Sequence, residues 1–172
     1  MIQFAVMIQF LLTVNIYSFS VRTADGQTLS MSQFRGRKIF IVNTASASTY
    51  VNQLKSLEQL RQKYASNLVI LAFPSNDFGH EPLTDSAITQ TLHDEYAAGY
   101  VVCAKGSVAG SNGLPLFQWL GDALQNGSIS NPVSGDFFKY LIDENGNIEG
   151  VFSGPIDPMD SVVTRAIETN YN

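Results

Sequence analysis

The sequence predicts one α/β domain in which helices flank a mixed central β-sheet and a β-hairpin comes first. Two continuous apolar runs, residues 39–42 and 68–73, are typical of strands buried on both faces of a sheet. Residues 50–64 lie between these runs and have helical periodicity, so a crossover is expected to join two parallel strands. An Asn-Gly pair at residues 145–146 separates two later apolar segments and indicates that the last two strands are antiparallel.

The length and composition favour one folded domain, which we expect to span residues 16–172. The chain has 172 residues, of which 45% are hydrophobic and 11% are aromatic, and this is enough to form an apolar core. Ten basic residues against 15 acidic residues leave a net charge of −5. A basic stripe of the kind that binds nucleic acid is therefore not expected, and we predict no nucleic-acid partner.

Residues 1–15 are expected to form a hydrophobic leader. Residues 4–14 are apolar except for Gln9 and Thr13, a run shorter than the ~18 to 20 residues that span a bilayer, so no transmembrane helix is predicted. The run has the length of a signal-peptide core, but no basic residue precedes Arg22 and no Ala-x-Ala pattern marks a cleavage site. Two interpretations stay open: a signal peptide of a secreted or periplasmic protein, or a cytoplasmic chain with a misassigned start or an extra strand.

The pattern before and after the two buried strands predicts further elements. Alternating apolar residues around a short turn predict a β-hairpin over residues 17–31. Residues 84–96 and 114–124 have helical patterns, and Pro115 lies in the first turn of the second helix, where proline is tolerated.

The last third of the chain predicts a hairpin and a closing helix. The hairpin pairs residues 137–142 with residues 148–152. Asp157 is the expected N-cap of the helix and Pro158 its first residue, and the helix is expected to bury Met159 and apolar residues one and two turns later.

Cysteine and histidine are scarce, which limits the chemistry of the chain. Cys103 is the only cysteine, so an internal disulfide and a cysteine-rich zinc site are excluded. It lies in an apolar run and is expected to be a small buried hydrophobe, the alternative being a relocated redox thiol. His80 and His93 lack metal-ligand spacing, and His93 is expected at the surface. We predict neither a metal nor a cofactor.

This order of elements is that of a thioredoxin-like fold, and several segments carry a more specific resemblance. They occur in the same order and spacing as in the glutathione peroxidase family, over residues 16–167. The segments are residues 43–48 (NTASAS), 71–82 (LAFPSNDFGHEP), 115–120 (PLFQWL), 137–146 (FFKYLIDENG) and 158–160 (PMD). The resemblance implies an oxidoreductase fold whose members reduce hydrogen peroxide and organic hydroperoxides, with glutathione or thioredoxin as the electron donor.

The family's reaction requires an ionised cysteine or selenocysteine, and the resemblance assigns that position to Ser48. A thiolate at a helix N-terminus is favoured because the helix dipole stabilises the anion. A hydroxyl stays protonated at neutral pH unless a base removes its proton, and its oxygen cannot form the sulfenic acid that sulfur forms. Ser48 is therefore not expected to reduce peroxides.

The other positions of the family's catalytic tetrad also differ here. Asp77 stands where the family has glutamine, and Gly135 and Asp136 stand where it has Trp-Asn. Leu92 stands at the position of the resolving cysteine of some members, and Val101 at that of a proline which is cis in thioredoxin-like folds. These departures predict a pseudoenzyme or binding module for an unidentified small molecule or protein. Glutathione or thioredoxin is an expected partner only if activity is retained.

Two functional interpretations of the site stay open, and each has a simpler structural alternative. Ser48 with His80 and Asp77 could form a Ser-His-Asp hydrolase, while the plainer expectation is that Ser48 caps a helix that begins near residue 50. His80, Glu81, Asp77 and Asp136 could together hold a cation, while acidic loops are ordinarily solvated.

Four basic residues could contact glutathione by analogy with the family, but solvated surface is the expectation for each. They are Arg35, Arg37, Lys38 and Lys105.

Overall fold

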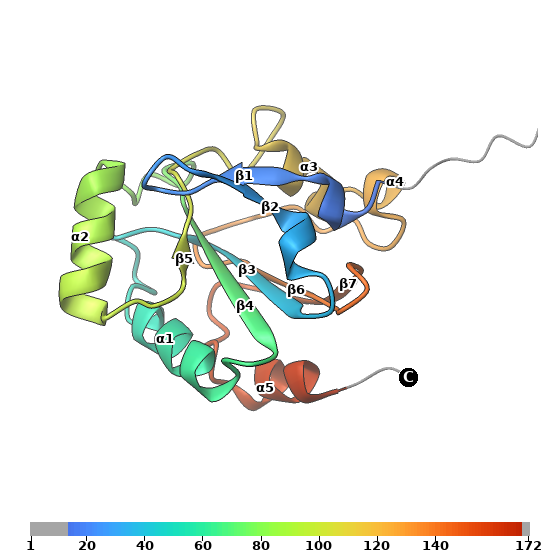
Figure 1. Ribbon diagram of the computed structural model, residues 1–172. Coiled ribbons are helices and arrows are strands. Elements are labelled where there is room, and N and C mark those ends of the chain that lie inside the picture. Colours follow the sequence, from blue (N-terminus) through green and yellow to red (C-terminus); the bar gives the residue numbers. More distant parts are fainter. Residues whose placement is uncertain (1–13, 170–172) are drawn as a thin grey trace, which may run out of the picture.

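The computed structural model describes residues 14–169 and contains a five-stranded sheet (Figure 1). Its strands, in spatial order, are β5 (Val101–Val102), β4 (Leu68–Pro74), β3 (Lys38–Thr44), β6 (Lys139–Ile142) and β7 (Ile148–Phe152). Strands β3, β4 and β5 run parallel, whereas β6 pairs antiparallel with β3 and β7 pairs antiparallel with β6. The predicted mixed α/β architecture is confirmed.

Apolar layers cover both faces of this sheet because the side chains of the central strand alternate in direction. Phe40 and Val42 of β3 pack in one cluster, and Ile39 and Ile41 pack in the other. The first face is covered by α1 (Gln53–Lys63), α2 (Asp85–Tyr96) and α5 (Ser161–Glu168). The second face is covered by β1 (Ser20–Arg22), β2 (Thr28–Ser30), α3 (Pro115–Gly121) and two 3₁₀ turns, η1 (Ile16–Ser18) and η2 (Met31–Phe34). The short helix α4 (Ala123–Asn126) follows α3 and has no buried residue.

The N-terminal hairpin is confirmed, but it is shorter than predicted. Strands β1 and β2 pair antiparallel, with Val21 opposite Leu29. Ile16–Ser18 forms the 3₁₀ turn η1 because the side chain of Asn15 accepts the Tyr17 N–H at 3.0 Å. Residues 1–13, and with them most of the expected leader, lie outside the described residues.

Two predicted helix boundaries are wrong because local side-chain caps intervene. The helix predicted over residues 114–124 is interrupted at Asp122, whose carboxylate accepts the Leu124 N–H at 2.9 Å and begins α4. The closing helix begins at Ser161 and not at Pro158, because the side chain of Asp160 is its N-cap. Asp157 instead accepts the Met159 N–H in the turn that precedes the helix.

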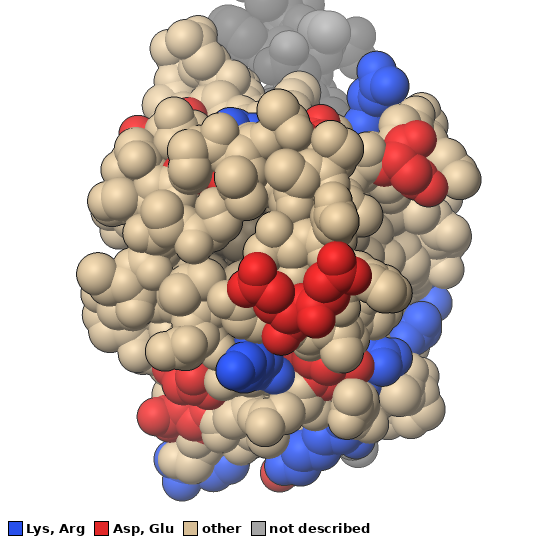
Figure 2. Space-filling view, turned by 90° about the vertical axis from the view of Figure 1, so that its left-hand side faces the viewer, with Lys and Arg blue, Asp and Glu red and all other residues tan. Residues whose placement is uncertain are grey.

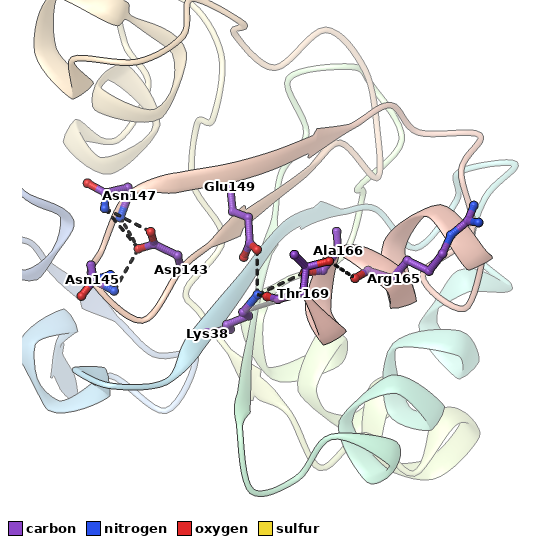
Figure 3. A network of polar contacts seen from close by, with 8 residues as sticks. All are labelled: Lys38, Asp143, Asn145, Asn147, Glu149, Arg165, Ala166 and Thr169. Atoms are coloured by element: carbon purple, nitrogen blue, oxygen red, sulfur yellow. Dashed lines mark hydrogen bonds and ion pairs between the residues drawn. The ribbon is translucent and has the colours of Figure 1, made fainter. Parts of the chain in front are cut away.

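A buried ion pair at the amino end of β3 corrects the expectation that Lys38 is solvated. Lys38 Nζ lies 2.7 Å from Glu149 Oε1, and both side chains are buried (Figure 3). The same ammonium donates to the carbonyl oxygens of Ala166 at 3.1 Å and Thr169 at 2.6 Å. The network therefore joins β3 and β7 to the C-terminal end of α5.

A second buried lysine lies at the other end of the sheet. Lys139 Nζ donates to the carbonyl oxygens of Phe137 at 2.6 Å and Gly154 at 3.2 Å. Burial lowers the pKa of Lys139 to about 7, and Asp157 opposes this shift.

None of the helices in residues 14–169 has the length and hydrophobicity of a membrane-spanning segment.

Candidate functional site

Ser48 lies in the turns that lead from β3 into α1, and its hydroxyl has a structural partner. The side chain is buried, and its Oγ accepts the Tyr50 N–H at 3.3 Å. The Ser48 carbonyl accepts the Val51 N–H at 3.1 Å. Helix α1 begins at Gln53, so Ser48 is not its N-cap as predicted; it caps the turn that comes before the helix.

Asp77 accepts hydrogen bonds from a neighbouring loop and does not pair with His80. Its Oδ2 accepts the N–H groups of Val108 at 2.6 Å and Ala109 at 2.9 Å, and the hydroxyl of Ser107 at 3.0 Å. One carboxylate oxygen thus orders the loop that follows β5. A hydrolase triad of Ser48, His80 and Asp77 is therefore not supported.

His80 pairs instead with Asp136, a residue 56 positions later in the chain. His80 Nδ1 lies 2.5 Å from Asp136 Oδ2. The Asp136 side chain is only 5% exposed, whereas that of His80 is 53% exposed. Asp136 Oδ1 is buried and has no hydrogen-bond partner among residues 14–169. The pair therefore shields a buried carboxylate and leaves one edge of an imidazole accessible.

The segment that carries Asp136 is positioned by the central strand. The Asn43 side chain donates to the Gly135 carbonyl at 3.1 Å and accepts the Phe138 N–H at 2.9 Å. Phe137 adopts a left-handed conformation, with φ of 55°. Gly154 lies directly against the Asp136 carbonyl, where a Cβ atom at position 154 would come within 2.4 Å of that oxygen. Close backbone contacts therefore fix the position of the Asp136 carboxylate.

Glu81, predicted as a possible cation ligand, holds the turn after β3. Its carboxylate accepts the Ser46 N–H at 2.8 Å, the Ser46 hydroxyl at 2.7 Å and the Leu83 N–H at 3.2 Å. Lys105 Nζ donates to the carbonyls of Glu81 and Leu83 at 2.7 and 2.9 Å, so Lys105 is also structural. Only His80 and Asp136 of the four predicted ligands meet, and no group of three or more His, Cys, Asp or Glu side chains suited to a metal occurs in residues 14–169.

The remaining basic candidates also contact the protein itself. The Arg35 guanidinium lies 4.2 Å from the centre of the Tyr17 ring. Arg37 donates to the carbonyls of Ala65 at 3.1 Å and Leu68 at 2.9 Å.

Cys103 is fully buried in the apolar layer beneath the hairpin. Burial raises the pKa of its thiol to about 12, so the thiolate that redox chemistry requires is strongly disfavoured. His93 lies on the exposed side of α2 beside Asp94, as predicted.

A cavity of about 250 Å³ lies between α1 and α2, next to the turn that contains Ser46. Its wall includes Leu92, which stands at the position of the resolving cysteine, together with Leu54, Ile88 and the rim residue Glu95. Figure 2 shows acidic side chains gathered on the face that α2 presents.

Comparison with known proteins agrees with this architecture. The family model described as glutathione peroxidase matches residues 16–121. The chain belongs to the glutathione peroxidase family. The glutathione peroxidase homolog BsaA of Bacillus subtilis is 32% identical over 149 residues, which cover 86% of this chain and 93% of the relative. The homolog of the same name from Staphylococcus aureus strain MW2 is 34% identical over 155 residues, or 89% and 96% of the two chains.

Solved structures place the family member in a wider fold group. The crystal structure of Trgpx in its apo form has a TM-score of 0.69 at 25% identity and covers 91% of this chain and 97% of that one. A thiol:disulfide interchange protein of the thioredoxin family from Chlorobium tepidum has a TM-score of 0.63 at 20% identity, with 87% and 92% covered. The predicted thioredoxin-like fold is therefore confirmed.

Proposed function

We propose that this chain is a glutathione peroxidase family member without thiol peroxidase activity, retained as a binding module. The observation that carries the proposal is the pair of residues Ser48 and Cys103. The hydroxyl at the peroxidatic position already accepts the Tyr50 N–H, and the only thiol is buried with its pKa raised to about 12. A peroxide in solution therefore meets no ionised sulfur.

The surroundings of Ser48 support loss of function beyond one substitution. Asp77 and Glu81 accept hydrogen bonds from backbone N–H groups, and Asp136 is engaged by His80. These carboxylates accept hydrogen bonds from the protein itself, so they supply no donor that would polarise a peroxide. A cysteine placed at residue 48 alone would lack the donors that activate a peroxidatic thiolate.

Peroxide consumption by the purified chain tests the proposal. With hydrogen peroxide or cumene hydroperoxide as substrate, and glutathione or thioredoxin as donor, we expect no turnover above a protein-free blank. Cys103→Ser is expected to leave this result unchanged. Catalytic turnover by the native chain would overturn the proposal.

The Ser48→Cys variant tests whether the missing sulfur alone explains the loss of activity, or whether changes elsewhere in the pocket also contribute. We expect this variant to stay near the blank, and Thr49→Cys serves as the matched control because residue 49 is exposed one position away. Turnover restored by Ser48→Cys alone, and not by Thr49→Cys, would show that the pocket survives and would contradict wholesale divergence.

An altered activity is the second candidate, favoured by the contact between His80 and Asp136. In this arrangement the carboxylate orients the imidazole, as an acid residue does for a catalytic histidine. Ser48 would be the nucleophile, since its hydroxyl keeps its own proton and a second lone pair while it accepts the Tyr50 N–H. Hydrolysis of p-nitrophenyl acetate that is lost in both Ser48→Ala and His80→Gln would favour this candidate, and hydrolysis unchanged by either variant would exclude it.

A further inference from the structure

One face of helix α2 forms a wall of the cavity of about 250 Å³ that lies between α1 and α2. Ile88, Thr91, Leu92 and Glu95 line it, and their spacing is that of residues that project from the same side of a helix. Ile88 and Leu92 are buried, Thr91 is half-buried and Glu95 is exposed. The wall is therefore apolar inside and polar at its mouth.

The remaining walls supply further apolar surface and set the size of a ligand. Val51 precedes α1, Leu54 lies in its first turn, and Leu83 lies in the segment before α2. A cavity of about 150 Å³ lined by Leu, Ile and Phe side chains holds one benzene molecule. A volume of about 250 Å³ is therefore large enough for an aromatic ring that carries a short chain.

Both charged side chains that line the cavity are acidic, and none of its lining residues is Lys, Arg or His among residues 14–169. The carboxylate of Glu81 is occupied by hydrogen bonds from Ser46 and Leu83. Glu95, at the mouth, takes part in none of the ion pairs formed within the same residues. A cation at the mouth would thus be attracted and an anion repelled.

Tyr96 adds a second group that attracts cations. It lines the cavity and is half-buried. Burial raises the pKa of Tyr96, and the negative charge of the neighbouring Glu95 raises it further. An ammonium at this position would meet a carboxylate and the face of an aromatic ring, both of which bind cations.

We propose that this cavity binds a small amphipathic amine, with an apolar group the size of an aromatic ring between α1 and α2 and one ammonium at Glu95. The acidic lining disfavours glutathione as the occupant, because that tripeptide carries two carboxylates and one ammonium. The inference rests on the proposed binding role of the chain and adds the class of ligand to it.

Titration of the isotopically labelled full chain with phenethylamine, followed by methyl NMR, tests the proposal. We expect saturable shifts of the Leu54, Ile88 and Leu92 methyl signals with a dissociation constant of about 1 mM or lower, and no shift of Val162, which is exposed on α5. The neutral isostere 2-phenylethanol should bind about two- to fivefold more weakly, and the anion 3-phenylpropionate should not saturate.

Two pairs of variants separate the charge from the cavity. Glu95→Gln should weaken phenethylamine about two- to fivefold and leave 2-phenylethanol unchanged. Asp94→Asn, which removes the same charge one position away and outside the cavity, should change neither ligand. Thr91→Trp should fill the cavity and weaken both ligands at least about tenfold, whereas Gln90→Trp, at an exposed position, should weaken neither.

Any of four results would overturn the proposal. They are the absence of saturable phenethylamine shifts at the cavity, 3-phenylpropionate binding as tightly as phenethylamine, equal effects of Glu95→Gln and Asp94→Asn, and equal effects of the two tryptophan variants. Circular dichroism of each variant identifies any loss of binding that unfolding causes, and the ligand series on the native chain does not depend on the variants. Peroxide turnover would overturn the proposed function without affecting amine binding, so the two failures are distinguishable.

Discussion

The two ends of strand β3 bury polar groups in different ways. At the amino end, Lys38 and Glu149 compensate each other's charge, and carbonyl oxygens of α5 accept the other protons of the ammonium. At the carboxyl end, Asp77 and Glu81 bind mostly backbone N–H groups of adjacent loops, and Asp136 has one partnered and one unpartnered oxygen. The first end is an ion-pair network that joins two strands to a helix, and among residues 14–169 Glu149 Oε2, like Asp136 Oδ1, is buried without a hydrogen-bond partner. The second is a set of hydrogen bonds that hold adjacent loops together, located where the resemblance places a catalytic site.

The largest effect is expected from breaking the buried ion pair between Lys38 and Glu149. Glu149→Ala leaves Lys38 buried without its counter-ion, so the free energy of unfolding should fall by about 3 to 5 kcal/mol. Urea denaturation measures this loss. The double variant Lys38→Met with Glu149→Leu removes both charges and should recover most of the stability; no recovery would show that packing, not charge, dominates at this end.

A change of pH tests the second buried lysine. Because burial lowers the pKa of Lys139 to about 7, the folded chain loses this proton near pH 7 while the unfolded chain keeps it to about pH 10.4. Between these values the unfolded state binds more protons, so stability rises with pH. Relative to Lys139→Met, the native chain should gain about 2 kcal/mol between pH 7 and 9. Parallel curves for the two proteins would refute the lowered pKa.

Removing the partner of Asp136 tests the hydrogen bonds between loops at the carboxyl end of β3. His80→Ala leaves the buried carboxylate without its one hydrogen-bond partner, which should cost about 1 to 3 kcal/mol of unfolding free energy. His93→Ala is the matched control, because His93 and Asp94 form an equivalent contact that is solvent-exposed, and it should cost under about 0.5 kcal/mol. Equal losses of unfolding free energy in the two variants would show that the buried contact stabilises the fold no more than the exposed one.

The smallest effect is expected at Ser48. Ser48→Ala removes one acceptor from the Tyr50 N–H, so we expect a loss of about 0.5 to 1 kcal/mol and no change in peroxide consumption. Thr49→Ala, at an exposed neighbour, should be neutral in thermal denaturation. A stabilised Ser48→Ala variant would indicate that the hydroxyl is strained at this position, as functional groups often are.

Periodicity predicted the sheet and its helices well, because buried strands and amphipathic helices leave a direct pattern in the sequence. Strand β7 and helix α2 lie where the pattern places them, apart from one residue at the start of the helix. Boundaries were predicted less well. Asp157 was predicted as the cap of the closing helix, but it accepts the Met159 N–H in the preceding turn, and Asp160 caps the helix instead.

The pairs within the candidate site could not be predicted from local pattern. The contact between His80 and Asp136 joins loops 56 residues apart, and Asp77 turns toward a loop beyond β5 because backbone N–H groups there require an acceptor. Lys38 was expected in solvent, as were Arg35 and Arg37, because solvated surface is the default for a basic residue that no motif assigns to a site. Its burial depends on Glu149, which lies in a strand that reaches it only through the folded sheet.

The burial of Cys103 also makes the native chain inert toward thiol-specific labels. Any cysteine introduced at the surface would then be the only site at which a maleimide dye or spin label reacts with the intact protein. Conversely, the slow rate at which Cys103 of the unmodified chain is labelled would measure how often the layer beneath the hairpin opens. This gives the rate of spontaneous unfolding without denaturant.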